Sequence, residues 1–121
     1  MLETERYKFS LFFKGETMNK IILVEGKTDK RALIQAGFSK EDIICTYGTV
    51  SFEQLEEFID QLEREELYFL FDEDFSGDKL RKQFIQAFPN GTIIRIPKEY
   101  KQVAETPVDV LTSILDKHFL L

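Results

Sequence analysis

The sequence has little of several residue types, and each shortage excludes a class of protein. Its 121 residues contain a single cysteine, Cys45, so neither an internal disulfide nor a cysteine-based zinc site can form. It has no tryptophan, only three prolines and no low-complexity tract. No apolar run approaches the roughly 20 residues that span a bilayer, and the first residues lack a signal-peptide pattern. We therefore expect no membrane association and a cytoplasmic location.

Basic residues are also scarce, with 16 Lys and Arg against 22 Asp and Glu and a net charge of -6. Because phosphate contacts need Lys and Arg, this balance argues against a strong general attraction to nucleic acid. A local positive rim is still compatible with the sequence, since several basic residues lie close to the acidic motifs described below: Lys27, Lys30, Arg31, Lys79, Arg81 and Lys82. We expect a weak nucleic-acid binder, or one that needs a protein partner.

Strand-like and helix-like segments alternate along the chain, which predicts an α/β fold. The predicted strands are about 20–24, 42–46, 67–71 and 92–96, and the predicted helices are about 28–36, 51–62, 77–87 and from 106 onward. They favour a Rossmann-like, four-stranded, mainly parallel sheet with helices on both faces. The domain is expected to span 19–121. Residues 1–18 are interpreted as an extension, either an added edge strand or a dimer contact. We expect that deletion of residues 1–17 leaves the rest of the chain folded.

Two helix starts are marked by capping residues. Ser51 followed by Gln54 is typical of a capping box, and Thr106 followed by Pro107 predicts an N-cap with proline at the first helical position. Helical spacing predicts buried faces on both helices. These faces are expected to include Phe52 and Val108.

Acidic residues follow two of the predicted strands. Glu25 comes directly after the apolar run Ile21–Val24, and Asp72 and Asp74 come after Tyr68–Phe71. Functional groups in a parallel sheet gather past the carboxyl ends of its strands, so neighbouring strands would bring these acids together. Carboxylates about 4 Å apart repel by roughly 4 kcal/mol at an effective dielectric near 20. A hard divalent cation, Mg²⁺ or secondarily Mn²⁺, would offset this repulsion. The competing interpretation is that the acids only cap the helices that follow.

The segments Ile22-Leu23-Val24-Glu25-Gly26-Lys27-Thr28-Asp29 and Asp72-Glu73-Asp74-Phe75-Ser76-Gly77 resemble the toprim domain of topoisomerases, primases and some nucleases. The resemblance covers about 19–121 and is nearest to the toprim half of the bacterial ribonuclease that matures 5S ribosomal RNA. Two features of that ribonuclease are missing: its C-terminal RNA-recognition region and its basic stretch before the last helix. The chain is therefore similar to a small stand-alone toprim protein, and the substrate of that ribonuclease is not transferred to it.

The resemblance implies roles for individual residues. Glu25 would act as general acid or base in phosphodiester transfer and also contact metal, while Asp72 and Asp74 would hold magnesium directly or through water. Four further residues would bind phosphate: Gly26, Gly77, Lys27 and Arg81. The glycines would let the backbone turn and the phosphate approach, and the basic side chains would supply positive charge. Asp29 is either a helix-start charge or a site member, and Asp78 is either a helix-start charge or an outer metal ligand.

Three functions remain open at this point. The leading one is magnesium-dependent phosphodiester transfer or hydrolysis on RNA or DNA, as in a nuclease. The alternative is a magnesium-binding accessory module that binds nucleic acid or nucleotide and needs a partner for catalysis. A phosphatase or phospho-acceptor domain is the third, but it would leave the Glu25-Gly26 pair without a role. A homodimer is compatible with each of them.

Overall fold

The computed structural model describes residues 18–118 and 120–121, and its centre is a four-stranded sheet. The strands are β1 (Lys20–Val24), β2 (Ile43–Cys45), β3 (Glu66–Leu70) and β4 (Thr92–Ile94). Their order is β2-β1-β3-β4 and every pair is parallel. The predicted α/β class and the four-stranded parallel sheet are confirmed. The proposed extension falls on residues outside this description, apart from Met18, so its role stays a prediction.

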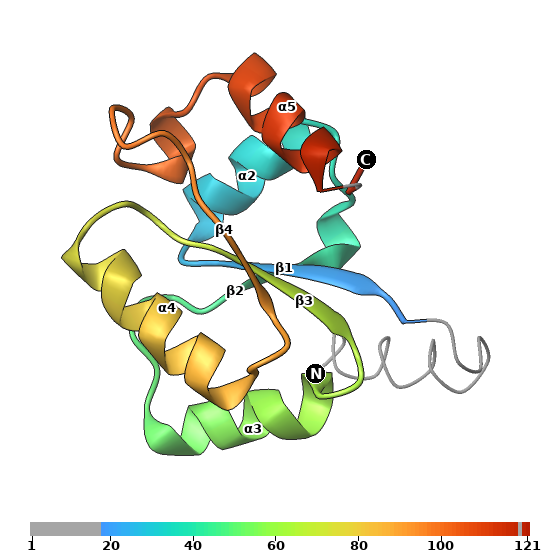
Figure 1. Cartoon of the computed structure of the whole chain (residues 1–121), viewed down its shortest axis with the longest axis vertical. Helices are drawn as coiled ribbons and strands as arrows, with labels where there is room; N and C mark the ends of the chain where they lie inside the picture. The colour runs from blue at the N-terminus through green and yellow to red at the C-terminus, as the bar shows by residue number, and fades with distance from the viewer. Residues whose placement is uncertain (1–17, 119) are drawn as a thin grey trace.

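Helices cover both faces of the sheet, as predicted. They are α2 (Lys27–Gln35), α3 (Phe52–Leu62), α4 (Phe75–Ala87) and α5 (Val108–Lys117), with short 3₁₀ turns η1 (Lys40–Asp42) and η2 (Val103–Glu105). Figure 1 shows α2 and α5 on one face and α3 and α4 on the other. Within the described part of the chain, no helix is long and apolar enough to cross a membrane.

The central strand β1 is buried from both sides. Ile22 and Val24 belong to the core beneath α2 and α5, whereas Ile21 and Leu23 belong to the core beneath α3 and α4. All four side chains are fully buried. Alternate residues of a strand point to opposite faces, so a sheet covered on both faces requires an uninterrupted apolar strand. This burial explains the continuous apolar run in the sequence and fixes where β1 ends, at Glu25.

The helix starts follow the sequence signals only in part. The capping box is confirmed: the Ser51 hydroxyl oxygen accepts from the Gln54 amide at 3.2 Å, and the Gln54 side chain accepts from the Ser51 amide at 2.9 Å. The Thr106 N-cap is wrong, because Pro107 takes that position and the Thr106 hydroxyl donates to the Gln102 carbonyl. The expected burial of Phe52 and Val108 is also wrong. They are 71% and 46% exposed, since each is the first residue of its helix, ahead of the turns that pack on the sheet.

Candidate functional site

The two acidic motifs meet at the carboxyl edge of the sheet. β1 and β3 are hydrogen-bonded neighbours in parallel register, so Glu25 and Asp72 leave the sheet at the same edge. The Ser76 hydroxyl, in the first turn of α4, donates to Glu25 Oε2 at 3.0 Å. This bond joins residues that are 51 positions apart and ties the side chain of the first motif to the helix that follows the second.

Asp29 lies in the first turn of α2, where it binds the helix start and feels the charge of the other acids. Its Oδ2 accepts a hydrogen bond from the Gly26 amide at 3.0 Å. The side chain is 6% exposed, and this burial, followed by the charges of Asp72 and Glu25, raises the pKa of Asp29 to about 6 against the opposing effect of its backbone hydrogen bonds. Asp29 is therefore a helix-start residue near other acids, and a role for it in a functional site stays a prediction.

In the β3–α4 loop, the two aspartates bind different backbone donors. Asp74 is the N-cap of α4, and its Oδ1 accepts from the Gly77 amide at 2.8 Å. Asp72 Oδ1 accepts from the Val103 amide of η2 at 2.8 Å. Burial raises the pKa of Asp72, as does the charge of Asp74, while the Val103 hydrogen bond and Arg81 oppose the rise. The sequence analysis missed Val103 as a partner because nothing local places η2 beside Asp72.

The two glycines of the motifs, Gly26 and Gly77, differ in how closely other atoms surround them. A Cβ on Gly77 would lie 1.8 Å from the Asp72 carbonyl oxygen, so only glycine fits where α4 starts against the loop. Gly26 has φ -145° and ψ -179°, an extended conformation open to any residue, and the nearest atom to its added Cβ is Asp29 Oδ2 at 4.0 Å. The expectation that Gly26 is needed for a sharp turn is wrong. The space beside it, next to the exposed Lys27, is open.

The buried side chain of Arg81 binds the backbone of the β3–α4 loop. It is 3% exposed, and its guanidinium donates to the carbonyl oxygens of Phe71 and Asp72, each at 3.1 Å. It also pairs with Asp78 at 2.6 Å, which lowers the pKa of that carboxyl, and lies 3.6 Å from Glu73. The structure gives Arg81 a positioning role and pairs Asp78 with it. Contact of Arg81 with phosphate and contact of Asp78 with metal stay predictions.

The carboxylates suit a hard divalent cation in their chemistry but are not preassembled around one. Among the described residues, no group of three or more His, Cys, Asp or Glu is arranged to hold a metal ion. The hydrogen bonds above use one oxygen each of Glu25, Asp72 and Asp74, which leaves a second carboxylate oxygen on each. Oxygen donors of this kind are what Mg²⁺ prefers. Burial, and then neighbouring negative charge, raises the pKa of Asp29 and of Asp72, and a cation would offset the repulsion between the charges.

Backbone strain concentrates beside this site. Within the described ranges, only two non-glycine residues have positive φ, Tyr47 at 58° and Lys101 at 62°. The Tyr47 amide donates to the Glu25 carbonyl at 2.7 Å, and the Lys101 carbonyl accepts from the Glu73 amide at 2.7 Å. Each strained residue therefore holds the backbone of one acidic loop. Strain of this kind accumulates at functional sites, where the surrounding structure maintains it.

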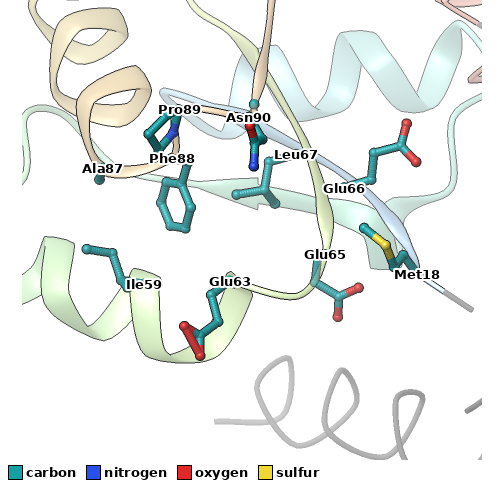
Figure 2. A pocket seen from close by; sticks show the side chains of 11 residues that line it. Met18, Ile59, Glu63, Glu65, Glu66, Leu67, Ala87, Phe88, Pro89 and Asn90 are labelled. Carbon is teal, nitrogen blue, oxygen red and sulfur yellow. The ribbon is translucent and has the colours of Figure 1, made fainter. Parts of the chain in front are cut away.

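A cavity of about 280 Å³ lies at the opposite edge, where the strands begin. Figure 2 shows Met18, Leu67 and Phe88 on its wall. Glu63, Glu65 and Glu66 also line it. Because β1 and β3 run from this edge to the other, the length of the sheet separates it from the acids at the strand ends.

Comparisons with known proteins agree with this architecture. Residues 22–107 match the family model described as Toprim-like. The chain is 38% identical over 102 residues to an uncharacterized protein of Bacillus subtilis (strain 168), YusF, covering 84% of this chain and 70% of that protein. It is also similar to the structure of a small TOPRIM domain protein from Bacillus stearothermophilus, with 38% identity, a TM-score of 0.77, and coverage of 85% of this chain and 87% of that one.

The matched region contains both acidic loops and the sheet, apart from Lys20 and Ile21 of β1. Toprim domains are in general magnesium-binding modules of nucleic-acid-related proteins. The residues that the structure brings to the carboxyl edge are those of the two motifs that resemble this domain. This chain belongs to the Toprim-like family, as a small toprim domain protein.

Proposed function

We propose that the chain is a magnesium-dependent phosphodiesterase that acts on nucleic acid. The observation that carries this proposal is the hydrogen bond from the Ser76 hydroxyl to Glu25, which joins the two acidic loops at one edge of the sheet. This bond supports a site in which Glu25 moves a proton while Asp72 and Asp74, after the neighbouring strand, offer oxygens to a cation.

Glu25, Asp72 and Asp74 would hold the ion, Mg²⁺ or alternatively Mn²⁺. When bound, such an ion supplies Lewis-acid stabilisation of charge on phosphate oxygens. Glu25 is proposed to transfer a proton to the leaving oxygen or from the attacking one, because it is half-buried and oriented by Ser76. Asp72 and Asp74 are held in place through Val103 and Gly77, so their remaining oxygens have a fixed direction.

The phosphate itself is proposed to approach over Gly26. The space there is open, and α2 begins at the next residue, so amides at its N-terminus favour an anion. Lys27 is exposed at the first position of α2 and adds a positive charge. Replacing Gly26 with alanine should therefore reduce turnover while leaving the fold intact.

A cleavage assay tests the proposal. The protein and its Glu25→Gln variant are incubated with Mg²⁺ and labelled RNA, DNA or a phosphomonoester, with Glu56→Gln, an exposed change on α3, as the matched control. We expect metal-dependent cleavage of nucleic acid that is lost by about 10²-fold or more in Glu25→Gln and retained in Glu56→Gln. Equal cleavage by all three proteins, or cleavage without metal, would contradict the assignment of Glu25.

The accessory-module alternative is favoured by two observations. The net charge of -6 weakens binding to phosphate, and the carboxylates are not preassembled around an ion. If the protein binds Mg²⁺ in calorimetry but cleaves no substrate in the panel, this alternative replaces the enzyme. A protein partner or a second copy of the chain would then be required to complete the site.

A further inference from the structure

Exposed aromatic residues gather at the same edge as the acids. Among aromatic residues in the described ranges, three are largely exposed: Phe75 at 84%, Phe52 at 71% and Tyr47 at 67%. Phe75 and Phe52 begin α4 and α3, and Tyr47 follows the end of β2. Helices that follow parallel strands begin at the carboxyl edge, so all three residues lie at the edge that carries the acidic loops. Single exposed apolar residues are ordinary, but a cluster beside a candidate site points to a ligand.

Phe75 is the first residue of α4 and stands between two residues of the acidic motifs' hydrogen bonds. Its neighbours in sequence are Asp74, which caps α4, and Ser76, which donates to Glu25. The backbone here is fixed by the close packing of Gly77 on the Asp72 carbonyl. The Phe75 ring is thus presented to solvent from a rigid helix start, one residue away from both acidic loops.

Tyr47 presents a second ring on the other side of Glu25. Its amide donates to the Glu25 carbonyl, and its side chain borders a cavity of about 190 Å³ between β2 and α3. Thr46, Gln54 and Gln61 also line that cavity. An aromatic ring next to amide and hydroxyl groups matches the chemistry of a nucleobase, which has flat apolar faces and a polar edge.

We propose that Phe75 and Tyr47 are stacking platforms for unpaired bases, and that the ligand of this edge is single-stranded nucleic acid. This inference rests on the proposed function, because it places bases around the phosphodiester that Glu25 would act on. Stacking is independent of charge and tolerant of sequence, so it suits a protein of net charge -6 that lacks a strong general attraction to phosphate. A duplex hides the faces of its bases and offers such platforms nothing to stack on.

Binding of short labelled RNA, measured by fluorescence anisotropy in Mg²⁺, tests the inference. All proteins carry Glu25→Gln, which prevents cleavage during the measurement, and each single strand is compared with a blunt duplex of the same sequence. We expect Phe75→Ala and Tyr47→Ala each to weaken single-strand binding by about tenfold, while Phe75→Tyr retains it. The control is Ile34→Ala, an exposed aliphatic side chain near the end of α2, which should change nothing.

The outcomes separate this inference from the proposed function. If Phe75→Ala and Tyr47→Ala bind single strands as the parent does, if the duplex binds equally well, or if the parent binds neither, the inference is overturned, even where the cleavage assay succeeds. If the unmodified protein cleaves nothing in the cleavage assay, but Phe75→Ala weakens single-strand binding, the proposed phosphodiesterase is overturned and the stacking inference is supported. A urea midpoint equal to that of the parent is expected for Phe75→Ala, because its ring is 84% exposed.

Discussion

The β1–α2 loop and the β3–α4 loop carry the same kind of signal but are held by different forces. Each follows one of two neighbouring strands and places acids and a glycine at a helix start. The β3–α4 loop is fixed by tertiary contacts, since Gly77 packs on the Asp72 carbonyl and Arg81 binds two carbonyls from beneath. The β1–α2 loop has no such close packing at Gly26 and is held by hydrogen bonds, from the Gly26 amide to Asp29 and from the Tyr47 amide to the Glu25 carbonyl. Similar motifs therefore have different tolerance to change, and substitutions can measure that difference.

Gly77→Ala should produce the largest effect. A methyl group 1.8 Å from the Asp72 carbonyl oxygen forces α4 away from the loop, and the clashing atom is backbone that cannot rotate aside. We expect the free energy of unfolding to fall by at least about 3 kcal/mol, measured by urea denaturation. A loss below about 1 kcal/mol would mean that the β3–α4 loop is as adaptable as its counterpart.

Arg81→Met comes next. It keeps most of the buried side-chain volume but leaves the carbonyls of Phe71 and Asp72 without their donors, so we expect a loss of about 2 kcal/mol. Lys82→Met, at the exposed neighbouring position, is the matched control and should change stability by less than about 0.5 kcal/mol. Arg81→Lys should recover only part of the loss, because an ammonium cannot reproduce the two-pronged contact. Equal stability of the two methionine variants would remove the supporting role of Arg81.

Asp29→Asn should change how stability depends on pH. Because the folded-state pKa of Asp29 is raised from 3.8 to about 6, its contribution to stability is complete below 3.8 and is lost as pH rises through about 6. The neutral asparagine keeps an acceptor for Gly26 without this loss. We expect the variant to exceed the parent by roughly 2 kcal/mol at neutral pH and to match it in acid.

Denaturation at several pH values, with and without Mg²⁺, measures this effect. A residual pH dependence remains in the variant because the pKa of Asp72 is raised as well. Magnesium should reduce the difference in unfolding free energy between the variant and the parent at neutral pH, since a cation favours the ionised form of Asp29. A parent protein that gains stability as pH rises through this window would contradict the cause assigned to Asp29.

Gly26→Ala should have the smallest effect on stability and is the counterpart of Gly77→Ala. The residue is extended and its added Cβ finds no atom closer than 4.0 Å, so we expect a change within about 0.5 kcal/mol. Urea denaturation of the two alanine variants side by side gives the comparison directly. A loss similar to that of Gly77→Ala would show that both loops are equally constrained.

Much of the site could be read from the sequence because it depends on strand ends. The apolar run that ends at Val24 marks where β1 stops, and the run that ends at Phe71 marks β3 to within one residue. Residues that act through distant contacts were not visible in this way. Ser76 belongs to the second acidic motif, but its hydrogen bond to Glu25 forms only because β1 and β3 are neighbours in the sheet.

Arg81 is a residue whose expected role depended on tertiary contacts that the sequence does not show. A basic residue near an acidic motif predicts a phosphate contact, but the fold places this one at 3% exposure with its donors bound to the loop. Phe52 was expected in the core because it fits the helical spacing of α3, and it lies at the exposed edge instead. Spacing identifies a helix face but not how far along that face the packing extends.

The sequence by itself determined the strand and helix order, the parallel sheet and the positions of the acids, because these follow from local patterns of burial and turning. Tertiary structure alone decided that Gly77 must be glycine, that Arg81 is buried and supports the loop, and that burial raises the pKa of Asp29 to about 6. Each of these depends on which distant atoms lie within a few ångströms, and the order of the residues does not specify that distance.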